Sequence, residues 1–214
     1  MRFFGNNLTC IRGERVVFTG LDFSISPGDA VILTGRNGTG KTSLLRVMAG
    51  LTHAATGSMS WEDSTVADDP EKHRCRLNYI GHLDCVKPVL TVRENLQSWA
   101  RLRDTGDDGV TDGLQKFGLD HLSHIPGRYL SAGQRHRLSL ARLGLGSAPL
   151  WLLDEPTIAL DSEAVAALNQ VITEHRKTGG MVVIATNVAL GIDDAATIDM
   201  GNFTAAAGED LQWG

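Results

Sequence analysis

The sequence predicts an α/β fold in which helices cover both faces of a mainly parallel sheet. Short apolar runs typical of buried strands lie at residues 30–34, 150–153 and 181–185. Helical periodicity separates them, most clearly over residues 92–103 and 162–177. The 214 residues, of which 42% are hydrophobic, suffice for one well-buried domain over the whole chain, but not for two. Strands that alternate with helices favour a parallel sheet with ligand chemistry at the carboxyl ends of its strands.

A helical lobe is expected as an insertion between about residues 84 and 130, where the pattern turns helical and the connections are rich in Gly and Asp. The chain from residue 203 onward is weakly patterned and predicts no element. We expect the remaining elements to be strands at 15–18 and 21–25, a turn at 27–29, a glycine-rich loop at 35–40, and helices at 42–51 and 131–145.

Charge and hydropathy exclude several classes of function. A net charge of -5 gives no electrostatic reason to bind nucleic acid, and the basic cluster at residues 135–137 predicts a solvated helix face. No run approaches the roughly 18 to 20 apolar residues of a membrane span, and no signal region is evident, so we expect a cytoplasmic chain. Cys10, Cys75 and Cys85 form no C-x-x-C pair, and no histidine lies in a haem-attachment pattern. Neither a disulfide framework, a zinc site nor a haem site is predicted.

A phosphate-binding loop is the strongest signal in the chain. Residues 35–42 match G-x-x-x-x-G-K-[ST], with a predicted strand before them and a predicted helix after them. The glycines let backbone N–H groups turn toward phosphate oxygens, and the helix adds its positive N-terminal end. The pattern assigns Lys41 to the β and γ phosphates of ATP and the Thr42 hydroxyl to Mg²⁺. The residues expected to bind ATP are Gly35, Arg36, Asn37, Gly38, Thr39, Gly40, Lys41, Thr42 and Ser43.

Two carboxylates follow the apolar run at residues 150–153. A protein with a phosphate-binding loop needs an acid on the magnesium side of the nucleotide, and Asp154 is expected to hold Mg²⁺ directly or through water. Glu155 lies one residue beyond it. This carboxylate is therefore expected to orient and deprotonate the water that attacks the γ-phosphate.

A second anion-binding helix start is predicted at residues 130–134, Leu-Ser-Ala-Gly-Gln. Ser131 and the backbone amides of Gly133 and Gln134 lie where the positive end of a helix attracts anions. Taken alone, Ser131 is also a common helix N-cap. Two phosphate-binding helix starts in one chain suit a dimer that holds ATP between the loop of one copy and this segment of the other.

This segment resembles the L-S-G-G-Q signature of the ABC ATPases, with Ala132 where that family usually has glycine. The resemblance extends from about residue 8 to residue 195. It implies the P-loop fold of that family, in which an N-terminal antiparallel β part and an inserted helical lobe accompany a RecA-like core. The residues that it places against the ATP of the partner copy are Ser131, Gly133, Gln134 and, in the D-loop at 159–161, Asp161.

Within that family, four stretches resemble the ATP-binding subunits of bacterial cytochrome c maturation exporters. The resemblance implies an ATPase at the cytoplasmic face of the inner membrane that drives haem export with integral membrane permease subunits. We expect the permease to dock on the helical lobe near Pro88 and Trp99, although a helical Trp is also a common core residue. The stretches are residues 79–84, 87–96, 129–135 and 148–156.

Three positions depart from the family pattern. His82 falls where the family has the Q-loop glutamine, and it either takes that place toward water or Mg²⁺ or is an ordinary loop histidine. Asn187 stands where the family has a histidine on the γ-phosphate, and its amide can donate a hydrogen bond but cannot take up a proton to become positively charged. Arg12 replaces the aromatic that usually stacks on adenine, and its guanidinium either stacks on the base or lies on the surface. These departures leave open a gating subunit with weak hydrolysis.

Two other classes of function compete with a transport ATPase. Soluble ABC ATPases of DNA repair, chromosome structure or translation usually carry coiled-coil insertions, zinc modules or two cassettes, none of which this sequence contains. A small-molecule P-loop kinase has no use for the segment at residues 130–134. The prediction is therefore an ATP- and Mg²⁺-dependent transport ATPase that works as a homodimer with membrane permease subunits and without nucleic acid.

Overall fold

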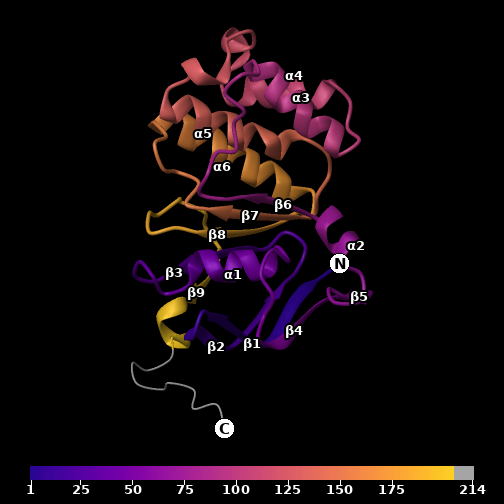
Figure 1. Ribbon diagram of the computed structural model, residues 1–214, viewed down its shortest axis with the longest axis vertical. Coiled ribbons are helices and arrows are strands. Elements are labelled where there is room, and N and C mark those ends of the chain that lie inside the picture. The colour runs from indigo at the N-terminus through magenta and orange to yellow at the C-terminus, as the bar shows by residue number, and fades with distance from the viewer. Residues whose placement is uncertain (205–214) are drawn as a thin grey trace.

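Two β-sheets and the helices around them make up the computed structural model, which describes residues 1–204 apart from the side chain of residue 108. Helix α1 (Lys41–Met48) lies between the two sheets (Figure 1). The longer helix α6 (Ser162–Lys177) covers the other face of the larger sheet. The predicted α/β fold with helices on both faces of a sheet is confirmed. The last ten residues of the predicted domain lie outside the described part.

The larger sheet has the order β6 (Leu77–Ile80), β7 (Leu150–Asp154), β8 (Met181–Ala185), β3 (Ala30–Thr34) and β9 (Ala196–Asp199). All neighbouring strands in it are parallel, as the alternation of strands and helices predicted. The register aligns Asp154 at the end of β7 with Ala185 at the end of β8, and Ala185 with Leu33 of β3. Three neighbouring strands therefore end side by side, and the segments that follow them meet there.

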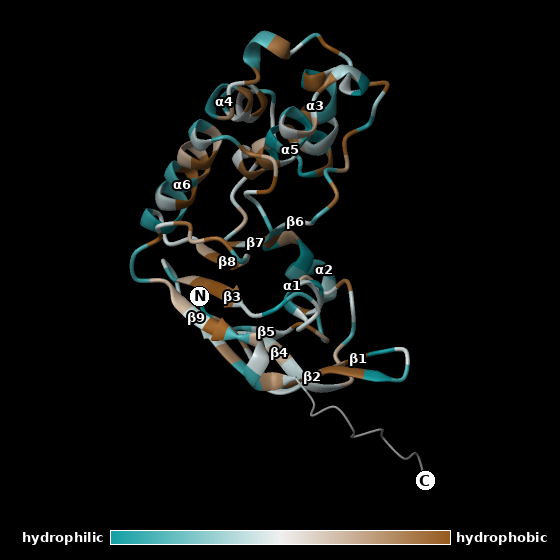
Figure 2. Cartoon of the chain, turned by 90° about the vertical axis from the view of Figure 1, so that its left-hand side faces the viewer, coloured by the Kyte–Doolittle hydropathy of each residue, from teal (hydrophilic) through white to brown (hydrophobic). Residues whose placement is uncertain are grey.

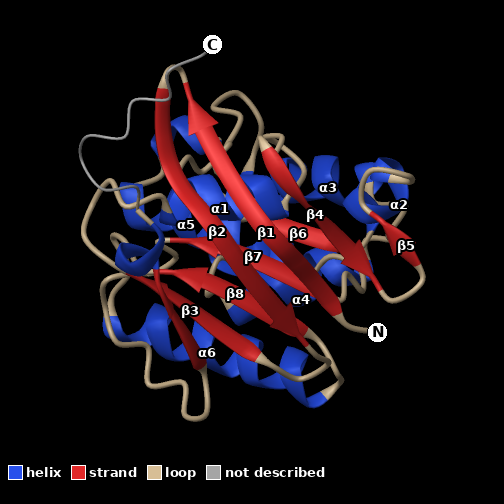
Figure 3. Cartoon of the chain, turned by 90° about the horizontal axis from the view of Figure 1, so that it is seen from below, coloured by secondary structure: helices blue, strands red, loops and turns tan. Residues whose placement is uncertain are grey.

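The smaller sheet is antiparallel and contains the N-terminal strands, as the family resemblance implied. Its order is β2 (Arg15–Ile25), β1 (Phe3–Arg12), β4 (Thr56–Trp61) and β5 (Ser64–Thr65), and it forms the near layer in Figure 3. The sequence pattern predicted separate strands at 15–18 and 21–25, which was wrong because β2 is continuous. Gly20 has a φ of +66°, and together with the shifts in register against β1 it absorbs the interruption without ending the strand.

The two hydrophobic cores lie on opposite faces of the parallel sheet. Successive side chains of a strand point to opposite faces, and β7 illustrates the consequence. Leu150 and Leu152 pack into the core that contains α1 and the antiparallel sheet. Trp151 and Leu153 pack into the core beneath the helices on the other face. A run that is apolar at every position is thus explained by burial on both faces.

The helices α3 (Val92–Leu102), α4 (Asp108–Lys116) and α5 (Ala132–Leu140) gather at one end of the molecule (Figure 2). The helix expected over residues 131–145 is shorter, because α5 gives way to a 3₁₀ turn at Ala141–Gly144. This turn packs closely on α4, where a Cβ at Gly113 would lie 2.7 Å from the Ala141 carbonyl oxygen. None of the helices within the described residues has the length and apolar character of a membrane span.

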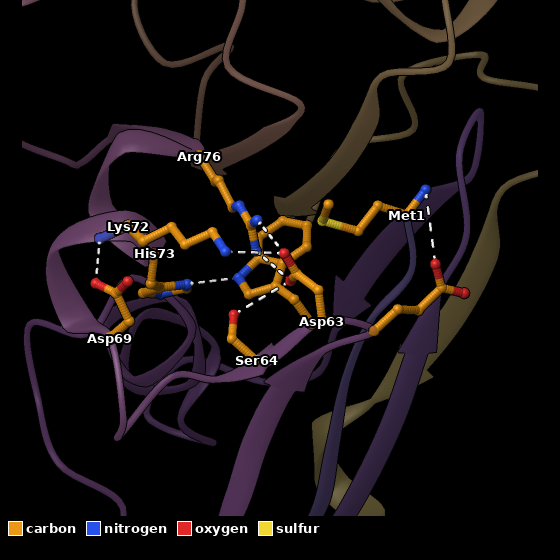
Figure 4. A network of polar contacts seen from close by, with 9 residues as sticks. Met1, Asp63, Ser64, Asp69, Lys72, His73 and Arg76 are labelled. Atoms are coloured by element: carbon orange, nitrogen blue, oxygen red, sulfur yellow. Dashed lines mark hydrogen bonds and ion pairs between the residues drawn. The ribbon is translucent and has the colours of Figure 1, made fainter.

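A polar network that the sequence analysis did not predict connects helix α2 (Pro70–Cys75) with β4, β5 and α1 (Figure 4). The indole N–H of Trp61 donates to Nδ1 of buried His73 at 3.0 Å, and Nε2 of His73 donates to the Met48 carbonyl oxygen at 2.9 Å. Asp63 accepts two hydrogen bonds from the Arg76 guanidinium, at 2.7 and 2.8 Å. Each imidazole nitrogen and both carboxylate oxygens thus have a protein partner.

Candidate functional site

The loop between β3 and α1 has a backbone that requires glycine at two positions. Gly35 and Gly40 have φ values of 130° and 102°. A Cβ on Gly35 would lie 2.8 Å from Thr39 Oγ1, and one on Gly40 would lie 2.8 Å from Val17 Cγ1 of β2. No side chain caps the start of α1, so the first amides of this helix remain available to an anion. The exposed tip of the loop consists of Arg36, Asn37 and Gly38, and Ser43 is buried in α1.

Lys41 connects this loop to the end of β8. Its side chain is only 7% exposed, and Nζ donates hydrogen bonds to the Gly35 carbonyl oxygen at 2.6 Å and to Asn187 Oδ1 at 3.1 Å. The amide Nδ2 of Asn187 in turn donates to Asn37 Oδ1 at 3.1 Å. The structure therefore brings Asn187 onto the loop from a position 146 residues away in the chain, and neutral amide oxygens, rather than a carboxylate, hold the ammonium group.

Asp154 is a buried acid, and one of its two carboxylate oxygens has no hydrogen-bond partner among the described residues. The Thr42 hydroxyl donates to its Oδ1 at 3.0 Å, while Oδ2 has no hydrogen-bond partner among the described residues. Burial raises the pKa of Asp154, and the Thr42 hydrogen bond and the nearby charges of His82 and Lys41 act against that rise. A desolvated carboxylate with a free oxygen beside a hydroxyl fits a hard cation such as Mg²⁺, whose other ligands come from phosphate and water. Among the described residues, no group of three or more His, Cys, Asp or Glu side chains is arranged so that it could hold a metal ion.

Glu155 follows directly after β7 in a strained backbone conformation. Its φ of +51° lies in the left-handed region, which costs a non-glycine residue about 1 kcal/mol or more. Its N–H donates to the Ala185 carbonyl oxygen at 2.8 Å, so the end of β8 holds it in place. The side chain is half-buried, unlike that of Asp154. The two acids therefore have different environments at adjacent positions.

His82 lies in the loop that follows β6, the strand next to β7, and its side chain is exposed. It is near enough to Asp154 for its charge to lower the pKa of that carboxyl, against the larger effect of burial. No hydrogen bond of the described residues joins His82 to either acid. The structure thus brings His82 to the site without assigning its role.

The segment at residues 130–134 lies at the start of α5 and close to the D-loop. Ser131 caps the helix in a capping box: its Oγ accepts from the Gln134 backbone N–H, and its own backbone N–H donates to Gln134 Oε1. Gly133 permits close approach, because a Cβ there would lie 2.7 Å from the carbonyl oxygen of Ala159, whose φ is +60°. Asp161 caps α6 by accepting from the backbone N–H of the third helical residue at 2.9 Å. No described hydrogen bond joins these residues to the loop at 35–42 of the same chain.

Arg12 is exposed at the end of β1, where it pairs with Arg15 across the hairpin. The same hairpin reaches the phosphate-binding loop through Val17, which lies against Gly40. A stacking role for Arg12 on adenine therefore stays a prediction.

His136 is a residue of this region that the sequence analysis missed. The cluster at residues 135–137 predicted a solvated face, but His136 is only 5% exposed. Its ring bonds to Asp84 Oδ1 at 2.7 Å and to the Pro156 carbonyl oxygen at 2.9 Å. The available signal was the position of His136 four residues before buried Leu140, on the same helix face.

The chain matches the family model described as ABC transporter over residues 18–158. It is 49% identical to the cytochrome c biogenesis ATP-binding export protein CcmA of Paramagnetospirillum magneticum, with 95% of this chain and 96% of the relative covered. It is 48% identical to the protein of the same name from Rhodospirillum rubrum, with 94% and 86% covered. The corresponding protein of Nitrobacter winogradskyi is 50% identical, with 90% and 94% covered.

Solved structures have the same fold. A putative ABC transporter ATP-binding protein from Pyrococcus furiosus superposes with a TM-score of 0.83 at 21% identity, covering 96% of this chain and 100% of that one. A dimeric ATP-binding cassette in a post-hydrolysis state, bound to ADP and Pi, superposes with a TM-score of 0.78 at 24% identity, covering 87% and 88%. The chain belongs to the ABC transporter family, as an ATPase of the group of cytochrome c biogenesis ATP-binding export proteins.

Proposed function

We propose that this chain hydrolyses ATP with Mg²⁺ at the ends of β3, β7 and β8 and thereby drives haem export or handling for cytochrome c biogenesis. One observation carries the assignment of the site. Lys41, the Thr42–Asp154 pair, Glu155 and Asn187 come from separate parts of the chain and meet at the ends of three adjacent strands. Each supplies a group that phosphoryl transfer needs: a cation, a metal site, a base and a hydrogen-bond donor.

The phosphates of ATP bind to the loop at residues 35–43. Backbone amides and the start of α1 receive the oxygens, and Lys41 exchanges its bond to neutral Asn187 for one to the β and γ phosphates. This exchange is favourable because no carboxylate competes for the ammonium group at its present position. The Asn187 Nδ2 has a second N–H besides the one it gives to Asn37 Oδ1, and this N–H donates to the γ-phosphate in place of the family's histidine.

Thr42 and Asp154 would hold Mg²⁺, because the Thr42 hydroxyl and the Asp154 Oδ2, which has no partner among the described residues, are oxygen groups that suit this ion. The bound ion would supply positive charge against the charge that develops on the β and γ phosphates. Glu155 orients and deprotonates the attacking water, and His82 holds that water from the neighbouring loop.

Two copies of the chain hold the nucleotide between them. Ser131, Gly133, Gln134 and Asp161 act on the ATP of the partner copy, because they lie at the starts of α5 and α6 and make no described hydrogen bond to the loop at 35–42 of their own chain. The family neighbour that is dimeric with ADP and Pi supports this arrangement. ATP favours the closed dimer because it contacts both copies only in that state.

The permease docks on the lobe, at the loop before α3 and the turn before α5. Three apolar side chains there are largely exposed: Leu83 at 77%, Val89 at 74% and Tyr129 at 67%. Their occupant is an apolar cytoplasmic segment of an integral membrane subunit, which suits a peripheral position at the cytoplasmic face of the inner membrane. Trp99 does not belong to this surface, since it packs in the lobe with the Arg142 guanidinium 3.6 Å above its ring.

Buried Asn95 prepares this surface for docking. Its Nδ2 donates to the carbonyl oxygens of Lys87, Leu90 and Thr91 at 2.9 to 3.1 Å, and its Oδ1 accepts from the Lys87 N–H at 2.8 Å. The exposed Val89 side chain therefore sits on a loop that one amide holds in a single conformation. A fixed loop lowers the ordering cost of binding.

A weakly hydrolysing gating subunit is the second candidate, and Asn187 in place of a protonatable group is the observation that favours it. Phosphate release by the purified chain with Glu155→Gln separates the two. Under the leading proposal this variant loses at least roughly 100-fold in rate and keeps ATP binding, while Glu163→Gln in the first turn of α6 stays at the wild-type rate. Equal release by Glu155→Gln and wild type contradicts the hydrolytic role of Glu155.

The haem assignment has its own test. A strain that lacks this gene is expected to lose covalent haem on periplasmic c-type cytochromes, and the wild-type copy, but not Glu155→Gln, restores it. Membranes should also retain the tagged chain together with a hydrophobic partner subunit. Normal cytochromes in the deletion strain refute the pathway but leave the ATPase intact.

A further inference from the structure

His136 joins three separate parts of the structure through one ring. The residue lies on α5, Asp84 lies in the loop between β6 and α3, and Pro156 directly follows Glu155. The ring is 5% exposed, and both of its nitrogens have oxygen partners at 2.7 and 2.9 Å. Helix α5, the loop between β6 and α3, and the segment after β7 are thus joined through one buried ring.

The chemistry of the partner at Nε2 determines the proton on that nitrogen. A peptide carbonyl oxygen only accepts, so Nε2 carries a proton toward Pro156. Nδ1 faces the Asp84 carboxyl, 2.7 Å from its Oδ1. One face of the ring contact is thus fixed by a backbone carbonyl and the other by a side chain of the loop before α3.

The contact with Pro156 bears on Glu155, the proposed catalytic base next to it in the chain. Glu155 has a φ of +51° and is held on its N-terminal side by the Ala185 carbonyl oxygen. The bond from His136 to the next carbonyl holds it on the other side. A left-handed non-glycine residue needs such support from its surroundings. His136 thereby maintains the backbone that aims the Glu155 side chain.

The contact with Asp84 connects His136 to the loop before α3, where we propose that the permease docks. Asp84 lies next to Leu83, which is 77% exposed, and its own side chain is 26% exposed. A partner that pressed on the loop would move Asp84 and, through the 2.7 Å bond, the His136 ring. The other nitrogen of the same rigid ring transmits the displacement to Pro156.

We infer that His136 is a positioning residue that couples the loop at 81–91 to the catalytic geometry of Glu155, an inference that rests on the proposed base role of Glu155. Nδ1 contacts Asp84 in the loop, and Nε2 contacts Pro156 next to Glu155. The bond through Nε2 sets the rate of hydrolysis, and the bond through Nδ1 makes that rate respond to the membrane partner.

Two amide substitutions separate these bonds, because the amide nitrogen of Gln reaches about as far as Nε2 and that of Asn about as far as Nδ1. The measurement is steady-state phosphate release by the intact chain. His136→Ala should lower kcat roughly 10- to 100-fold through misplacement of Glu155, with KM for ATP changed by less than about threefold. His136→Gln should restore most of that loss, and His136→Asn should not. Equal kcat values for the Gln and Asn variants overturn the assignment.

Asp84→Ala tests the other side with Nε2 left in place. In the complex with its membrane partner, this variant and His136→Gln should lose most of the stimulation that the partner gives to wild type. Full stimulation in both contradicts the coupling. Thermal unfolding of each variant guards against a purely structural effect, since loss of folded protein lowers the active fraction but does not separate Gln from Asn. If Glu155→Gln hydrolyses ATP at the wild-type rate, the base assignment fails, whatever the result at His136.

Discussion

Two polar clusters in this molecule, one around buried His73 and one around buried Asp154, differ in how completely their hydrogen bonds are made. Around His73, both ring nitrogens have partners, and the Asp63–Arg76 pair nearby is bidentate. Around Asp154, one carboxylate oxygen has no partner, and burial raises the pKa of the acid. Glu155 beside it has a strained backbone. The first cluster stabilises the fold, whereas the second keeps unsatisfied groups that a ligand completes.

The comparison is sharpest at Lys41, which lies near Asp154 in the cluster whose hydrogen bonds are incomplete. Lys41→Ala should lower kcat/KM for ATP roughly 10²- to 10³-fold, because an ammonium group on the developing phosphate charge is lost. The midpoint of thermal unfolding without nucleotide should change little, since Lys41 is held only by neutral oxygens. Lys72→Ala, which removes a surface ion pair with Asp63 at 2.9 Å, is the matched control and should leave hydrolysis unchanged. A large drop in the unfolding midpoint of nucleotide-free Lys41→Ala would show that this cluster also stabilises the fold, contrary to the distinction between the two clusters.

Asp154→Asn should separate function from stability in the same cluster. The amide oxygen still accepts from the Thr42 hydroxyl, but the charge proposed to bind Mg²⁺ is gone, so we expect at least roughly a 100-fold loss of Mg²⁺-dependent hydrolysis. Because burial disfavours the ionised carboxyl, the nucleotide-free variant should be as stable as wild type or more stable. Urea unfolding with and without MgATP measures both effects. Marked destabilisation of the nucleotide-free variant would assign Asp154 a structural role instead.

His73→Ala tests the other cluster, in which every polar group of the ring has a partner, and should change stability rather than activity. It removes two buried hydrogen bonds and leaves the Trp61 N–H without a partner, which should lower the free energy of unfolding by about 2 to 3 kcal/mol. The folded fraction should keep the wild-type KM and kcat for ATP. His53→Ala, at an exposed position, should change neither quantity. A changed KM for the folded His73 variant means that the two clusters are not independent.

The pH dependence of stability gives the smallest expected effect. Burial lowers the pKa of His73 and of His175, whose ring stacks on Trp151 at 3.7 Å. With folded pKa values below the unfolded one of about 6.5, stability is complete above that pH and falls as the pH drops. The limiting slope is about 1.4 kcal/mol per pH unit for each histidine. Urea titrations between pH 7.5 and 5 on wild type and His73→Gln check this, with a shallower slope expected in the variant; an unchanged slope excludes His73.

Residues whose chemistry depends on local spacing were predictable from the sequence. The loop at residues 35–42 was predictable because its proposed phosphate contacts come from consecutive backbone groups. The acids at 154 and 155 were predictable because they directly follow the apolar run at residues 150–153. The capping role of Ser131 likewise depends on its own helix. The weak alternation of β4 and the short β6 did not allow prediction, because their burial comes from partners distant in the sequence.

Asn187 and His136 show the limit of a local pattern. The alignment with the family pattern indicated Asn187, but its bond to Lys41 spans 146 residues and follows only from the register of β3 with β8. For His136, the sequence pattern suggested a solvated face. Burial depended on the packing of α5 against the loop at Asp84 and the turn at Pro156.

By itself, the sequence determined the α/β class, the phosphate-binding loop and the adjacent acids, since each of these depends on residues close together along the chain. Only the tertiary structure decided which polar groups are satisfied and which are left open for a ligand. That distinction depends on partners brought together by strand order and register, as the free oxygen of Asp154 and the two-sided contact of His136 show. A hydrogen bond between distant segments leaves no periodic trace in a single sequence.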